Sequence, residues 1–119
     1  MNTEQSEVIE ARQRAVAGQP TDPALQVALG DACFAAGDTA RARTAYERAI
    51  ALDPDNWAAH NAIGHVYYRL DLPAESLAAY ERAIAIDPHK EHPYYGLAIL
   101  LATKLGRFAE AHAVLARGL

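Results

Sequence analysis

The feature that most constrains this chain is a ten-residue stretch that occurs twice. AYERAIALDP at residues 45–54 returns as AYERAIAIDP at residues 79–88, thirty-four residues later, with one Leu-to-Ile change. Aligned without a gap, residues 23–56 and 57–90 share thirteen of thirty-four positions. A fixed period of this length is typical of a chain built from stacked copies of one small structural unit.

Each copy predicts two helices joined by a short turn. In residues 23–56 a helix begins after Asp22, a candidate N-cap, with Pro23 at its first position, and it stops at Gly37. A second helix ends before Pro54, because the residue that precedes a proline avoids helical geometry. The next copy repeats this arrangement, so each unit is predicted to be an antiparallel helix pair.

Two glycines lie in the middle of the predicted first helices. Gly30 and Gly64 are each expected to cost about 1 kcal/mol relative to alanine at such a position. We expect them to face small residues of the second helix, Ala42 and Ser76 respectively, so that the two backbones come close. The free energy gained by close helix packing then offsets the free energy that glycine costs in helix propensity.

Weaker copies flank the two central units. Residues 91–119 predict a third pair, which is incomplete and carries one inserted residue before Gly106. Residues 1–22 predict a single helix, over about residues 3–17, that corresponds to the second half of a degenerate unit. The sequence therefore predicts one all-α domain of seven helices.

The repeated residues are similar to the tetratricopeptide repeat family. The family pattern of Leu-Gly, Tyr, a small residue, an aromatic residue, Ala and Pro appears in the second copy as Ile63, Gly64, Tyr67, Ser76, Tyr80, Ala83 and Pro88, and in the first as Leu29, Gly30, Cys33, Ala42, Tyr46, Ala49 and Pro54. Departures are Cys33 and Leu101 in place of Tyr, and Ala98 in place of Gly. The resemblance implies a right-handed α-solenoid of stacked antiparallel helix pairs, in which each pair covers the apolar face of its neighbour. Tyr46 and Tyr80 are then expected to fill the gap between successive units.

The resemblance also implies a concave face, because the first helix of each pair lines the inside of the superhelix in this family. The inner residues expected here are Val27, Asp31, Phe34, Asn61, His65, Tyr68, Arg69, His92, Tyr95, Ile99 and Thr103. Such a mixture of aromatic, aliphatic and hydrogen-bonding groups suits an extended or helical peptide. The leading prediction is a non-catalytic adaptor that binds a protein partner in this groove; the alternative for Phe34 and Tyr68 is that they pack only against neighbouring helices.

One partner class is disfavoured by the residues themselves. Some members of the family hold the acidic tail of heat-shock chaperones with a clamp of Lys, Asn and Arg side chains. The matching positions here hold Val27, Asp31, Ala62, His92 and Gly96. None of them fits, and the Asp31 carboxylate would repel a tail carboxylate, so we expect no binding of such tails.

Composition disfavours several other classes of partner. The formal net charge is -4, with five histidines, so no basic field is present to attract nucleic acid. The longest apolar runs are far shorter than a membrane span, and the first residues have no signal-peptide core. We therefore expect no nucleic-acid or membrane partner and a cytoplasmic location.

No residue pattern predicts catalysis, a cofactor or a metal site. The HKEH stretch at residues 89–92 lies in a predicted loop without a fourth ligand nearby in sequence. The single cysteine, Cys33, is expected to be a small buried hydrophobe rather than a nucleophile. His65 could tune peptide binding with pH near neutrality.

Two further functions stay open. The sequence ends at AHAVLARGL without the extra polar helix that usually covers the last unit of this family. We expect some leucines of the third unit to face that position and to allow self-association into a homo-oligomer; they are Leu97, Leu101, Leu105 and Leu115. The remaining alternative is that the chain is part of a longer protein, such as the regulatory segment of an enzyme.

Overall fold

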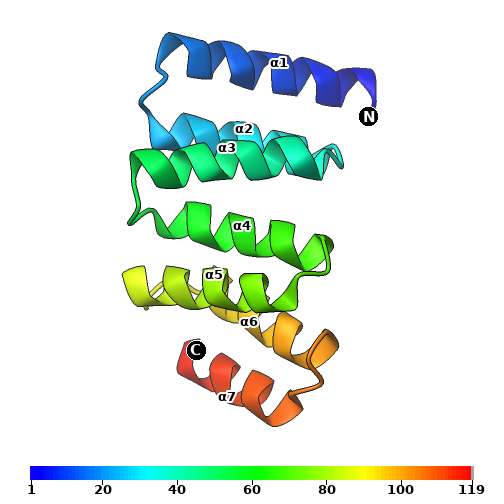
Figure 1. Cartoon of the computed structure of the whole chain (residues 1–119), viewed down its shortest axis with the longest axis vertical. Helices are drawn as coiled ribbons and strands as arrows, with labels where there is room; N and C mark the ends of the chain where they lie inside the picture. The colour runs from blue at the N-terminus through cyan, green and yellow to red at the C-terminus, as the bar shows by residue number, and fades with distance from the viewer. Residues whose placement is uncertain (119) are drawn as a thin grey trace.

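The computed structural model describes residues 1–118, which form seven α-helices and, within that range, no β-strand. The helices are α1 (Thr3–Gly18), α2 (Pro23–Ala35), α3 (Thr39–Leu52), α4 (Trp57–Arg69), α5 (Pro73–Ile86), α6 (His92–Thr103) and α7 (Phe108–Gly118). They stack in chain order from one end of the molecule to the other, over 45 × 28 × 22 Å (Figure 1). The predicted all-α solenoid of seven helices is confirmed.

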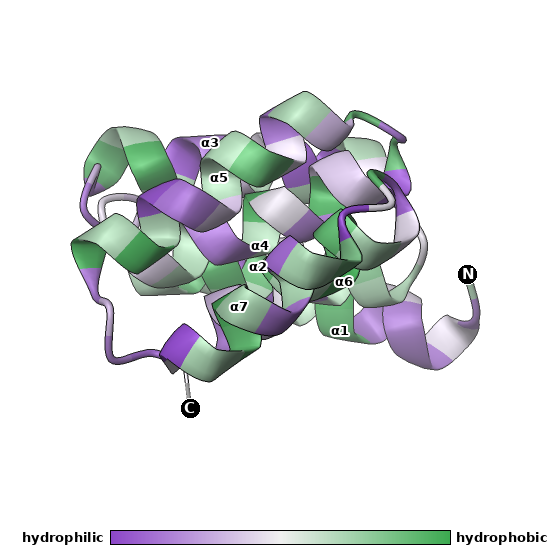
Figure 2. Cartoon of the chain, turned by 90° about the horizontal axis from the view of Figure 1, so that it is seen from below, coloured by the Kyte–Doolittle hydropathy of each residue, from purple (hydrophilic) through white to green (hydrophobic). Residues whose placement is uncertain are grey.

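Consecutive helices pair as the repeat predicts. The helix α2 packs against α3, α4 against α5, and α6 against α7, while α1 packs against α2. The inner helices α2, α4 and α6 also contact one another in sequence. Figure 2, seen from the α7 end, shows hydrophobic residues where helices face each other and hydrophilic ones in many of the connecting turns. The helix pairs fall inside the units proposed from the sequence, and the division of the chain into those units stays a prediction.

The ends of the helices follow from local side-chain chemistry. The Asp22 carboxylate accepts a hydrogen bond from the Ala24 backbone amide at 2.9 Å, which caps α2 as predicted. Asp53 and Asp87, which precede prolines, have extended backbone geometry and end α3 and α5. The repeated Asp-Pro pair therefore stops the second helix in both central units.

A left-handed residue makes the turn inside each helix pair. These residues are Gly37 with φ 82°, Asp71 with φ 59° and Gly106 with φ 64°. Asp71 is the one residue within 1–118 other than glycine that has a positive φ, a conformation that Asp tolerates better than most side chains. The three residues are separated by thirty-four and then thirty-five positions, in agreement with one inserted residue in the last unit.

Tyrosine rings occupy the space beside the mid-helix glycines. A Cβ added at Gly30 would lie 2.4 Å from Cε1 of Tyr46, and one added at Gly64 would lie 2.7 Å from Cε1 of Tyr80. Tyr80 fills the same space beside Gly96 on α6, at 2.6 Å. Glycine is needed at these sites because an aromatic ring of the second helix lies where a side chain would be. The expectation that small residues face the glycines did not include these rings.

One part of that expectation does hold. The hydroxyl of Ser76 donates a hydrogen bond of 2.9 Å to the backbone carbonyl of Gly64, so Ser76 lies against the glycine as well. Ser76 is fully buried, and this bond satisfies its polar atom.

Two of the four leucines proposed for self-association lie inside the chain rather than at an open end. Leu97 and Leu101 are 2% and 3% exposed and belong to an apolar cluster that includes Val114 of α7. Leu105 and Leu115 are half-buried against the same cluster. A contact between copies could not use the side chains of Leu97 or Leu101 without moving α7, which corrects the expectation for these two. For Leu105 and Leu115 a role in self-association stays a prediction.

Candidate peptide-binding groove

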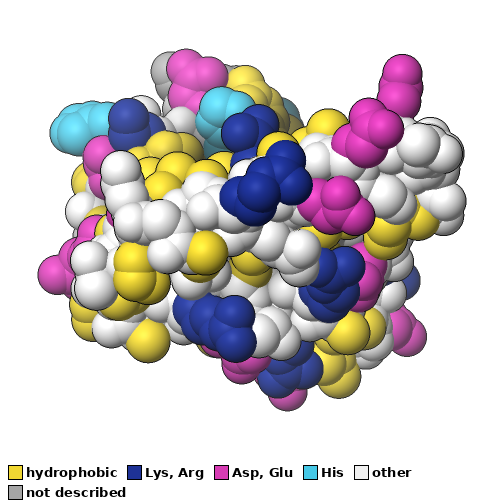
Figure 3. Space-filling model, turned by 90° about the horizontal axis from the view of Figure 1, so that it is seen from above, with side chains coloured by type: hydrophobic (Ala, Val, Ile, Leu, Met, Phe, Trp, Pro, Cys, Tyr) yellow, Lys and Arg dark blue, Asp and Glu magenta, His cyan; other side chains and the backbone are white. Residues whose placement is uncertain are grey.

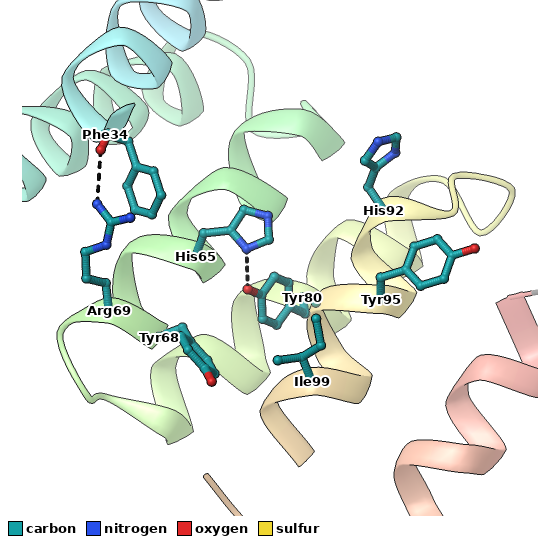
Figure 4. Close-up of a pocket in the computed structure, with 9 residues that line it drawn as sticks. Phe34, His65, Tyr68, Arg69, Tyr80, His92, Tyr95 and Ile99 are labelled. Atoms are coloured by element: carbon teal, nitrogen blue, oxygen red, sulfur yellow. Dashed lines mark hydrogen bonds between the residues drawn. The ribbon is translucent and has the colours of Figure 1, made fainter. Parts of the chain in front are cut away.

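Two adjoining pockets lie along the inner helices α2, α4 and α6. The first, here the apolar pocket, has a volume of about 460 Å³ and is lined mainly by aromatic and aliphatic side chains (Figure 4). Its lining residues are Phe34, His65, Tyr68, Arg69, Tyr80, His92, Tyr95, Gly96 and Ile99.

The second pocket, here the polar pocket, has a volume of about 350 Å³ and lies between α2 and α4, closer to the N-terminus. Its lining residues are Val27, Asp31, Phe34, Ala35, Tyr46, Trp57, Ala58, Asn61, Ala62, His65 and His92. Phe34, His65 and His92 line both pockets, so the two adjoin one another, and we call them together the inner groove.

A histidine–tyrosine pair forms the floor between the two pockets. Nδ1 of His65 and the hydroxyl of Tyr80 share a hydrogen bond of 2.6 Å, and their rings meet edge to face at 5.3 Å (Figure 4). Burial lowers the pKa of His65 below its ordinary value of 6.5, an effect that the nearby Asp31 charge opposes. Burial also raises the pKa of Tyr80 to about 12. At neutral pH the floor is therefore polar but uncharged.

The corresponding tyrosine of the first unit contacts a carboxylate. The hydroxyl of Tyr46 donates to Oδ1 of Asp31 at 2.5 Å. Burial, reinforced by this hydrogen bond, raises the pKa of Tyr46, so the hydroxyl keeps its proton and acts as the donor. The bond orients the Asp31 side chain, which is exposed on the inner face of α2.

The other charged residue of the groove is stacked on an aromatic ring. The guanidinium carbon of Arg69 lies 3.6 Å from the centre of the Phe34 ring, and its Nη1 donates to the Phe34 backbone carbonyl at 3.0 Å (Figure 4). This contact joins the C-terminal ends of α4 and α2. Phe34 thus packs against a neighbouring helix and also lines the groove, so the two interpretations of this residue are compatible.

Two large apolar side chains of α6 are exposed on the groove side. Tyr95 is 43% exposed and Ile99 is 53% exposed, although both lie on an inner helix and line the apolar pocket. Exposed apolar residues that gather in a concave site are typical of binding surfaces.

The sequence matches two models of one repeat family. A model described as TPR repeat matches residues 30–71, and one described as Tetratricopeptide repeat matches residues 57–90. The chain belongs to the tetratricopeptide repeat (TPR) family. Members of this family generally serve as non-catalytic protein-interaction modules, and membership supports such a role for this TPR chain.

Solved structures share the TPR fold of this chain. A crystal structure of MamA has a TM-score of 0.84 and 26% identity, and the match covers 96% of this chain and 66% of that one. A second crystal structure of MamA gives a TM-score of 0.83 with 26% identity, covering 97% of this chain and 62% of that one. TTC0263, a thermophilic TPR protein in Thermus thermophilus, gives a TM-score of 0.86 at 24% identity, with 93% and 62% covered.

This TPR chain therefore spans at most 66% of the length of those proteins. No curated protein matches its sequence.

Ten of the eleven inner residues predicted from the TPR resemblance line one pocket or the other. The exception is Thr103, whose hydroxyl instead forms a 2.8 Å hydrogen bond with the hydroxyl of Tyr68. That these residues bind a peptide stays a prediction.

Sequence reasoning missed three aromatic residues of the groove: Tyr46, Tyr80 and Trp57. The two tyrosines belong to the repeated stretch and were assigned to packing alone. The signal that could have found them is the polar hydroxyl carried by a ring placed against an inner helix.

Within residues 1–118, no three His, Cys, Asp or Glu side chains come together as a possible metal site. Cys33 is fully buried, as its core position predicts, and burial raises the pKa of its thiol. Cys33 lines neither pocket, so the expectation for this cysteine does not bear on the groove.

Proposed function

We propose that this chain binds an extended or helical peptide segment of a protein partner in the inner groove. The observation that carries the proposal is the adjacency of the two pockets along α2, α4 and α6, with Tyr95 and Ile99 exposed at one end. Burying their apolar surface under a partner side chain contributes about 25 cal/mol per Å². The groove therefore offers an apolar anchor site beside hydrogen-bonding groups.

Other classes of partner find little support in the surface. Figure 3, seen from the α1 end, shows acidic and basic side chains interspersed, with apolar side chains beside histidines near one edge. No helix within residues 1–118 is long and apolar enough to cross a membrane. The mixed charges favour recognition of a specific segment over a general electrostatic surface.

The first test is selection of peptides from a random library displayed on phage, read out by fluorescence anisotropy of the enriched peptides. Ile99→Arg places a charge in the apolar pocket and is expected to weaken binding at least tenfold. Val8→Arg is the matched control, because Val8 is 45% exposed on α1 and lines neither pocket. Equal binding by wild type and Ile99→Arg would move the site away from the groove.

A second variant removes a contact without adding charge. Tyr95→Ala is expected to weaken peptide binding several-fold and to leave helicity by circular dichroism unchanged, since Tyr95 is 43% exposed. Tyr68→Ala is less specific, because Tyr68 bonds Thr103 and packs against the core cluster of the last unit. A loss of thermal stability in Tyr68→Ala would therefore not count for or against the groove.

Self-association is a second candidate, favoured by one exposed residue. Phe108, the first residue of α7, is 70% exposed, whereas Leu97 and Leu101 are buried within the chain. We propose that any contact between copies at this end uses Phe108. Sedimentation at increasing concentration should show an oligomer that Phe108→Asp abolishes, and a wild-type protein that stays monomeric throughout would exclude this candidate.

A further inference from the structure

The inner groove changes its chemistry from one unit to the next. Asp31, His65 and Ile99 occupy the same position on α2, α4 and α6, since they are thirty-four residues apart. The side chain at this position is an acid in the polar pocket, a histidine on the shared floor and an aliphatic group in the apolar pocket. A partner segment that lies along the groove therefore contacts a negatively charged site at one end and an apolar site at the other.

The Asp31 carboxylate has acceptor capacity to spare. Its hydrogen bond from Tyr46 uses one of about four lone-pair sites. None of the ion pairs formed within residues 1–118 includes Asp31. The carboxylate is exposed and held in one orientation by a buried tyrosine, so it is prepared to bind a donor.

A second acceptor lies in the same pocket. Asn61 of α4 is 9% exposed and lines the polar pocket, and its Oδ1 has no hydrogen-bond partner among the described residues. A buried carbonyl oxygen without a donor costs free energy. This oxygen is shielded from solvent, so a donor in the pocket reaches it only if the carboxamide rotates. The acceptor groups of Asp31 and Asn61 therefore favour a ligand that donates several hydrogen bonds.

In the part of the chain that the structure describes, no lysine or arginine lines the polar pocket. Arg69 lines the apolar pocket and is stacked over Phe34 at 3.6 Å, while Lys90 lines neither pocket and lies over Trp57 at 5.4 Å. The formal net charge of -4 also favours the approach of a basic partner over an acidic one.

From these observations we infer that the inner groove selects a partner segment that carries a lysine or arginine toward one end and a large apolar residue toward the other. The basic side chain occupies the polar pocket against Asp31 and Asn61, and the apolar side chain occupies the apolar pocket against Tyr95 and Ile99. The inference rests on the proposed function and adds the chemistry of the partner.

The experiment uses phage-displayed random peptides selected on the wild-type protein. The expected result is enrichment of peptides with one Lys or Arg at a constant spacing from an apolar residue. The most enriched peptide is then labelled with fluorescein and compared with a version in which norleucine replaces the basic residue. Norleucine keeps an aliphatic chain and removes the charge, so its affinity for the wild-type protein should fall about tenfold.

Protein variants locate the effect at Asp31. Asp31→Asn keeps an acceptor for the Tyr46 hydroxyl and removes the charge, so it should bind the basic peptide about tenfold more weakly and the norleucine peptide unchanged. Asp55→Asn is the matched control, since Asp55 is exposed, pairs with Arg82 at 3.1 Å and lines neither pocket. The peptide comparison is made on the wild-type protein, so it decides the question even if a variant is unstable.

The possible failures can be told apart. Enriched peptides without a basic residue, or equal affinity of the basic and norleucine peptides, would overturn this inference and leave the proposed function standing. Equal affinity of the basic peptide for wild type and Asp31→Asn would overturn the assignment of the basic group to Asp31. Peptides whose binding survives Ile99→Arg, or no enrichment at all, would overturn both the inference and the proposed function.

Discussion

Tyr46 and Tyr80 occupy the same position of the repeated stretch, but their hydroxyl groups have different hydrogen-bond partners in the two central units. Each ring fills the space beside a mid-helix glycine of its own unit. The hydroxyl of Tyr46 donates to the Asp31 carboxylate, whereas the hydroxyl of Tyr80 meets the imidazole of His65. A repeated residue can therefore be structural through its ring and still take part in a site through its hydroxyl.

The two tyrosines also differ in what lies beyond them. Tyr80 packs against a second glycine, Gly96 on the next inner helix, while the corresponding position after Tyr46 is Ala62. Tyr80 is thus the closer link between two units. The identical stretch sets the shape of the scaffold, and the inner residue opposite it sets the chemistry of the groove.

The largest expected difference between the two tyrosines is the loss of stability when the Tyr80 ring is removed. Tyr80 is 1% exposed, and Tyr80→Ala is expected to lower the free energy of unfolding by about 3–5 kcal/mol, since it empties a space shared by α4, α5 and α6. Tyr46→Ala should cost less. Urea unfolding followed by circular dichroism measures both, and an equal loss in the two variants would mean that the contact with Gly96 adds nothing.

A smaller effect is expected when a methyl group is added beside the ring. Gly64→Ala would place its Cβ 2.7 Å from the Tyr80 ring, so overpacking of about 1–3 kcal/mol should outweigh the gain of about 1 kcal/mol in helix propensity. Gly18→Ala is the matched control, because a Cβ there meets nothing within 4 Å. Thermal unfolding checks both variants, and a stabilised Gly64→Ala would show that the ring can move away at little cost.

Removing only the hydroxyl group of each tyrosine compares the contributions of the two hydrogen bonds to stability. Tyr80→Phe leaves Nδ1 of the half-buried His65 without its partner and is expected to cost about 1–2 kcal/mol. Tyr46→Phe should cost about 1 kcal/mol or less, because water can reach the exposed Asp31. Chemical denaturation of the two variants tests this order, and the reverse order would mean that the carboxylate bond is the stronger one.

The smallest effect is a dependence of stability on pH that comes from His65. Because burial lowers its pKa in the folded protein below the ordinary 6.5, the unfolded chain takes up the proton first as the pH falls. The contribution of His65 to stability is therefore complete above pH 6.5 and is lost as the pH falls from there through the lower folded-state pKa.

His65→Gln is the comparison, because glutamine can still bond Tyr80 and does not titrate. Its free energy of unfolding should fall less between neutral pH and about pH 5 than that of the wild type. An NMR titration of the His65 ring that gives a pKa above 6.5 would contradict this expected dependence.

Much of the inner surface could be predicted from residue spacing. The period of thirty-four places Phe34, His65 and Tyr95 on the first helix of each unit, and all three line the groove. The spacing could not show that Tyr80 of α5 reaches His65 of α4, or that Arg69 stacks on Phe34. Those contacts depend on the angle and separation of packed helices, which no local pattern encodes.

The sequence by itself determined the number of helices, their ends at Asp-Pro and Gly, and the order in which they stack, because capping, proline geometry and a repeated apolar pattern act over short stretches of chain. Only the tertiary structure decided that Leu97 and Leu101 are covered within the chain, that tyrosine rings occupy the space beside the glycines, and that Asp31 meets the Tyr46 hydroxyl at the edge of a pocket. Burial and pairing are properties of residues distant in sequence that meet in space, so they appear only when the helices are in place.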